Sequence, residues 1–62
     1  MTEEKEFARK IIMEASQRAL KIFREDNPLP PKPNEEYFDR QREFINAYVF
    51  SHVPEETRLA AI

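Results

Sequence analysis

The chain reads Asn27-Pro28-Leu29-Pro30-Pro31-Lys32-Pro33 near its middle, and this segment holds four of its five prolines. Proline lacks a backbone N–H and its ring clashes with the preceding helical turn, so the segment cannot be helical through its length. The stretches on either side contain no proline until Pro54, and the 62-residue chain has no glycine. The sequence therefore predicts two helices joined by a stiff linker.

Capping residues and acidic first turns indicate where the helices begin. Thr2 and Asn34 are good N-cap residues, and each precedes two glutamates that favour the positive end of a helix dipole. Pro54 suits the first position of a short third helix. We therefore expect a single small helical domain over residues 1–62. Its predicted elements are helices at about 3–26, 35–52 and 54–61 and a proline-rich linker at 27–33.

The apolar residues of both long segments recur with helical spacing. At about 100° per residue, those of the first helix gather on one side, with alanine in the middle of the stripe. Small residues there would let a second helix approach closely. The second helix gathers an aromatic stripe that includes Tyr37, Phe44 and Tyr48. These patterns predict an all-α fold, a helical hairpin with a short third helix. The first stripe comprises Phe7, Ala8, Ile11, Ile12, Ala15, Ala19, Ile22 and Phe23.

Three large apolar residues, Met13, Leu20 and Phe50, fall outside these stripes. A hairpin has one buried side and cannot cover all of them. The core of so short a chain supplies only about 3–5 kcal/mol, and self-association is a common remedy. We therefore expect a two-fold homodimer in which two hairpins form a four-helix bundle. The predicted protein interface comprises Met13, Leu20, Phe44, Tyr48 and Phe50.

Other interpretations of the same residues stay open. Single apolar residues are common on ordinary protein surfaces. The third helix could also fold back over Phe50 within the chain, through Val53, Leu59 and Ile62. The linker contains two P-x-x-P spacings beside Lys32, which a groove for polyproline II segments could accept.

The composition excludes several kinds of site. Cysteine is absent, which excludes disulfides and thiolate zinc sites, and the single histidine excludes multi-histidine metal sites. The absence of glycine excludes phosphate-binding loops that depend on it. His52 has Val49 three residues before it, where a di-iron bundle has glutamate. We therefore expect no enzyme, no cofactor and no metal.

The charge balance points away from nucleic acid and membranes. Ten Lys and Arg stand against twelve Asp and Glu, for a net charge of −2. Binding to phosphates by counterion release needs a basic surface instead. No apolar run approaches the roughly 20 residues that span a bilayer, and the acidic start is unlike a signal peptide. The expectation is a soluble, cytoplasmic protein.

These observations favour a protein that acts by binding other proteins. We expect a small non-enzymatic interaction module, regulatory or adaptor, that is a homodimer and binds a target protein. One alternative is an accessory or assembly subunit that is stable only within a larger complex. A second alternative is a dimeric DNA-binding regulator.

Overall fold

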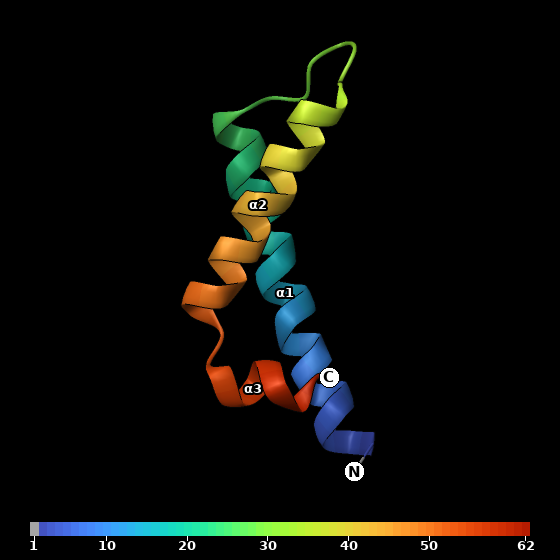
Figure 1. The fold of residues 1–62 in the computed structure, drawn as a ribbon, viewed down its shortest axis with the longest axis vertical. Helices are drawn as coiled ribbons and strands as arrows, with labels where there is room; N and C mark the ends of the chain where they lie inside the picture. Colours follow the sequence, from blue (N-terminus) through green and yellow to red (C-terminus); the bar gives the residue numbers. More distant parts are fainter. Residues whose placement is uncertain (1) are drawn as a thin grey trace.

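The computed structural model describes residues 2–62 and the side chains of residues 3–62. This part of the chain forms three α-helices and no strand: α1 (Thr2–Asp26), α2 (Glu35–His52) and α3 (Glu55–Ala60) (Figure 1). The predicted all-α class is confirmed. The molecule measures 43 × 18 × 15 Å, so it is elongated.

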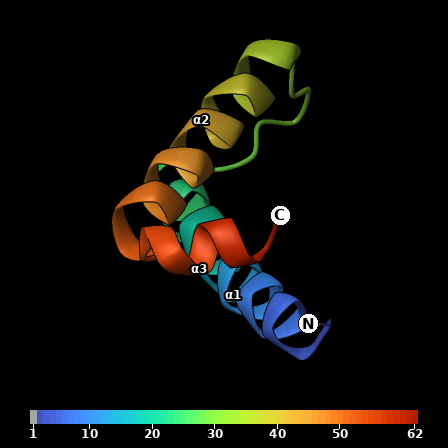
Figure 2. The same ribbon diagram turned by 60° about the horizontal axis from the view of Figure 1, so that its bottom comes forward.

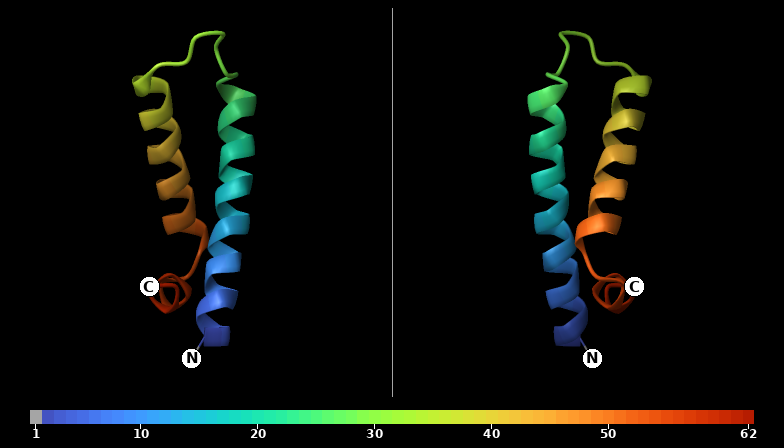
Figure 3. Two further views of the ribbon diagram at one scale, coloured as in Figure 1. Left: turned by 90° about the vertical axis from the view of Figure 1, so that its right-hand side faces the viewer. Right: turned by 90° about the vertical axis from the view of Figure 1, so that its left-hand side faces the viewer.

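The two long helices run in opposite directions, and the short one crosses the first. α2 returns along α1 from the linker, as the two side views show (Figure 3). α3 then turns across the N-terminal half of α1 and packs against it (Figure 2). α1 is therefore the element on which both others pack.

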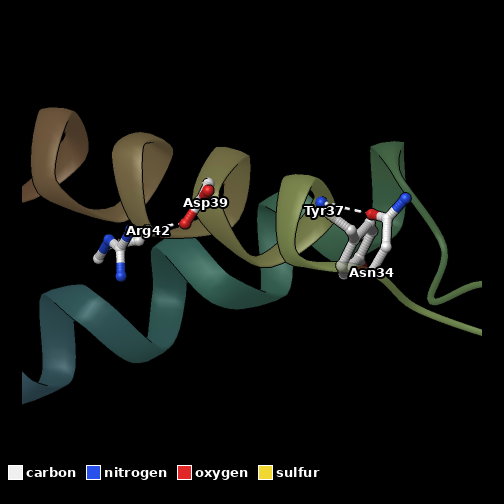
Figure 4. Close-up of polar contacts among 4 residues, drawn as sticks. All are labelled: Asn34, Tyr37, Asp39 and Arg42. Carbon is white, nitrogen blue, oxygen red and sulfur yellow. Dashed lines mark hydrogen bonds and ion pairs between the residues drawn. The ribbon is translucent and has the colours of Figure 1, made fainter.

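The helix ends follow local chemistry. The Oδ1 atom of Asn34 accepts a hydrogen bond of 2.9 Å from the Tyr37 backbone N–H, which confirms Asn34 as the N-cap of α2 (Figure 4). Pro54 has an extended ψ of 148° and is the N-cap of α3, so the prediction that it is the first helical residue is wrong by one position. α1 begins at Thr2, whose predicted capping side chain lies outside the described side chains.

The core is small and has two parts. Ala8, Ala15 and Ala19 are buried along α1, and Ala19 is 0% exposed. Near the linker, the Phe23 ring lies 5.5 Å from Tyr37 in an edge-to-face contact and 5.8 Å from Phe44. Such aromatic pairs contribute about 0.5–1.5 kcal/mol each beyond the area they bury. The alanine-lined seam and this aromatic cluster hold α1 and α2 together.

The first predicted stripe is wider than the part of α1 that is buried. Phe7 and Ile22, at one edge of the stripe, are exposed. On α2, Phe38 is exposed in the same way. One helix packed against another covers the middle of a stripe and leaves its edges in solvent.

Candidate protein-interaction surfaces

Large apolar side chains on the surface outnumber those in the core. Among the described residues, Phe23, Tyr37 and Val53 are the buried ones, and none is completely buried. Where exposed side chains of this kind form a contiguous patch, the patch is a candidate surface for contact with another protein. The exposed ones are Phe7, Met13, Ile22, Leu29, Phe38, Phe50, Leu59 and Ile62.

Two of the predicted interface residues, Phe44 and Tyr48, are partly buried, and the Phe44 ring packs against α1. The Phe44 ring lies against Phe23 and 6.4 Å from the Tyr48 ring. The Tyr48 ring stacks on His52 at 3.9 Å, and the His52 Nδ1 atom lies 2.9 Å from the Tyr48 carbonyl oxygen. Contacts within the chain therefore occupy part of both aromatic surfaces.

Met13 and Leu20 lie on one side of α1, together with Arg24, because successive residues turn by about 100°. Met13 is 55% exposed, and Leu20 is partly buried. The Arg24 Nε atom donates a hydrogen bond of 3.3 Å to Gln41 Oε1 of α2, so this side of α1 continues onto the Gln41 side of α2. Three apolar residues of α2 share that side. We call the combined surface the Leu20 face; it comprises Met13, Leu20, Phe38, Ile45 and Val49.

Phe50 does not belong to the Leu20 face. It follows Gln41 by nine residues, which is two and a half turns at about 100° per residue, so it lies on the opposite side of α2. It is 67% exposed, and the Arg58 guanidinium of α3 covers one face of its ring at 4.2 Å from the centroid. The predicted interface residues are therefore divided between different sides of the molecule.

α3 does not cover Phe50 with apolar side chains. Leu59 and Ile62 are 60% and 84% exposed, while Val53 is buried beside the turn into α3. The Arg58 Nε atom donates a hydrogen bond of 3.3 Å to the Val53 carbonyl oxygen. The alternative of an intrachain apolar cover over Phe50 is therefore wrong for Leu59 and Ile62, because α3 packs on α1 instead.

The packing of α3 on α1 creates a pocket that the sequence did not indicate. Its volume is about 240 Å³. Ile11 precedes Leu20 by nine residues, so the pocket opens on the side of α1 opposite the Leu20 face. The Arg9 Nε atom donates a hydrogen bond of 3.1 Å to the Ala61 carbonyl oxygen and ties the end of α3 to α1. The lining residues are Glu4, Phe7, Ala8, Ile11, Glu56, Thr57 and Ala60.

Hydrogen bonds from α2 hold the linker at its first residue, Asn27. The Tyr37 hydroxyl donates to the Asn27 carbonyl oxygen at 2.8 Å, and Arg40 Nη2 donates to Asn27 Oδ1 at 3.1 Å. Further along, the backbone bends at Pro31 and Lys32. A bend there interrupts the straight polyproline II segment that an aromatic groove would accept.

No group of three or more His, Cys, Asp or Glu side chains among the described residues is placed to hold a metal ion. None of the helices in this part of the chain combines the length and apolar character that crossing a bilayer requires.

Comparisons with models of protein families, with curated proteins and with solved structures find no match.

Proposed function

We propose that this chain is a small, non-enzymatic protein-interaction module of the cytoplasm, regulatory or adaptor in role, that forms a homodimer and binds a target protein. The observation that carries the proposal is the excess of exposed over buried large apolar side chains in the described residues. Three of the six buried apolar residues in this part of the chain are alanine, and they contribute little to stability, because an alanine side chain removes little apolar area from water. Covering the exposed residues with another chain would supply the missing stabilisation.

The proposed dimer joins two helical hairpins through their Leu20 faces to form a four-helix bundle. Met13 and Leu20 are seven residues apart on α1, and Phe38 and Ile45 are seven apart on α2. Seven-residue spacing keeps apolar side chains on one seam between packed helices. A two-fold axis would set the apolar residues of this face against their own copies, as in a self-complementary interface.

The test is the solution mass measured by light scattering after gel filtration over a wide range of concentrations. We expect twice the chain mass of 7.4 kDa for the parent protein. Leu20→Glu should scatter as a monomer at concentrations where the parent is a dimer, because it buries a charge in the shared seam. Met13→Glu should do the same, and its exposed position makes it the safer variant for monomer folding.

Ala47→Glu is the matched control, because it adds the same charge at an exposed position on the other side of α2. It should leave the dimer intact. A parent protein that is monomeric at every concentration would overturn the homodimer. A dimer that survives both Met13→Glu and Leu20→Glu would place the interface elsewhere.

The thin core also supports a second candidate function, an accessory subunit that is stable only in a larger complex. No large side chain of the described residues is completely buried. Such a subunit would be only partly helical when isolated and would gain helix when its partner is added. Circular dichroism of the purified chain separates the two candidates, because the homodimer should be fully helical alone.

A further inference from the structure

The pocket between α1 and α3 combines an apolar lining with two carboxylates. Phe7, Ala8 and Ile11 of α1 supply its apolar wall, while the exposed Glu4 and Glu56 come from the first turns of the two helices. α1 and α3 thus bring together two acidic side chains that are far apart in the sequence. A ligand in this pocket would contact apolar and anionic surface at the same time.

The size of the pocket suits one large apolar side chain. Its volume of about 240 Å³ lies below the roughly 300–1,000 Å³ of typical small-molecule sites. In protein interfaces, single large anchor residues fill well-packed pockets. Phe7 is 66% exposed at the pocket, so an arriving chain would find an uncovered aromatic ring there. The ligand class indicated by size is therefore a peptide segment.

The charge of the pocket specifies what should flank that apolar anchor. The ion pair of the described residues is Arg42 with Asp39, 2.6 Å apart on the exposed surface of α2 (Figure 4). No cationic side chain of residues 3–62 lies within 4.0 Å of the Glu4 or Glu56 carboxylate. An arginine could pair with these carboxylates and stack on the Phe7 ring.

We propose that this pocket docks a basic, amphipathic segment of the target protein, in which a large apolar residue lies next to arginine or lysine. The proposal rests on the proposed function, because it names the chemistry of the target. A second copy of this chain is a poorer occupant, since a two-fold contact here would set the same carboxylates against each other. The site lies on the side of α1 away from the Leu20 face, so dimerisation would leave it open.

The probe is a synthetic peptide of leucine and arginine in helical amphipathic order, about 14 residues long so that a marginal helix can form. A second peptide carries glutamate in place of arginine. Binding is followed by two-dimensional ¹H–¹⁵N NMR of the full chain. We expect the shifts caused by the basic peptide to concentrate on residues 4–11 and 56–60. The acidic peptide should not bind.

Charge reversal tests the acidic component. The double variant Glu4→Lys with Glu56→Lys should weaken binding of the basic peptide about tenfold and allow the acidic peptide to bind. The control double variant, Glu25→Lys with Glu43→Lys, has the same net charge but changes exposed carboxylates that do not line the pocket. It should retain most of the affinity. Equal weakening by both pairs would mean that only net charge matters, and would overturn the site.

The contribution of the apolar wall of the pocket can be tested with an equally close control. Phe7→Ala should weaken binding, whereas Phe50→Ala should not, although the two rings are almost equally exposed. No binding by the parent protein at millimolar peptide, or shifts that map to the Leu20 face, would also overturn the inference. Light scattering on the same samples keeps the two proposals apart. A dimer that does not bind the peptide rejects the pocket alone, and a monomer that binds it rejects the homodimer alone.

Discussion

Asn27 connects the end of α1 to the start of α2 through three groups of one residue. Its Nδ2 atom donates to the Phe23 carbonyl oxygen at 3.2 Å, its Oδ1 atom accepts from Arg40, and its carbonyl oxygen accepts from the Tyr37 hydroxyl. Short polar side chains commonly satisfy backbone groups at helix ends in this way. The angle at which α2 leaves the linker therefore depends on a few hydrogen bonds as well as on the prolines.

Tyr37→Phe should reduce the free energy of unfolding by about 1 kcal/mol, because it removes the donor to a partly buried carbonyl oxygen. Urea unfolding followed by circular dichroism measures the change. Tyr48→Phe is the control, since no hydrogen bond of its hydroxyl is formed among the described residues. Equal effects of the two variants would show that the Asn27 contact contributes nothing specific.

Residue chemistry predicted some helix ends better than others. Asn34 was identified as a cap because its side chain can accept from a backbone N–H two or three residues on. For Pro54, the sequence predicted the first helical position, whereas in the structure it is the N-cap, one position earlier. Proline fixes φ near −65°, a value that both positions allow, and only ψ distinguishes them. The value of ψ depends on how the chain turns at Val53.

At the scale of the helices, the alanine seam decides how closely α1 and α2 approach. Ala19→Leu should destabilise the fold by about 1–3 kcal/mol, because a fully buried alanine leaves no room for three more carbons. Ala47→Leu makes the same substitution at an exposed position of α2 and should be close to neutral. Thermal or urea unfolding compares them. An unchanged stability of Ala19→Leu would mean that the helices separate easily.

The helical pattern predicted the centre of each stripe and overestimated its width. From Phe7 to Phe23 the first stripe spans about 160° of α1 at about 100° per residue. A single helix packed alongside does not cover so wide an arc. The extra width of the apolar stripe at Phe7 and Ile11 thus indicated that a second element packs on that side. That width could not identify α3, whose six residues are too few to show a helical period.

At the scale of the molecule, the candidate surfaces could be predicted only in part from the sequence. Met13 and Leu20 could be grouped because they lie on one helix at a fixed spacing. Phe50 lies on another side of the molecule, which the sequence could not show, because helical spacing within α2 says nothing of which side of α2 faces which side of α1. The Arg24–Gln41 hydrogen bond supplies that relation. The pocket depends on where α3 crosses α1, which no local pattern specifies.

A homodimer should also show a melting temperature that rises with protein concentration, because association stabilises the folded state by mass action. Differential scanning fluorimetry over a hundredfold range of concentration measures this dependence, because that range changes the mass-action stabilisation by about 2.7 kcal/mol per mole of dimer. Met13→Glu should abolish it. A melting temperature independent of concentration in the parent protein would indicate that folding is complete in the monomer.

The pocket and the Leu20 face lie on opposite sides of α1, and this separation has a consequence for avidity. Two chains joined through their Leu20 faces would present two pockets on outward-facing surfaces. A target with two basic segments, or a target that is itself a dimer, could then engage both at once. The second contact would occur at a high effective concentration, which can strengthen binding by about 10²–10⁴-fold without any new contact. Weak individual docking would then suffice for firm attachment, and dissociation of the dimer would release the target.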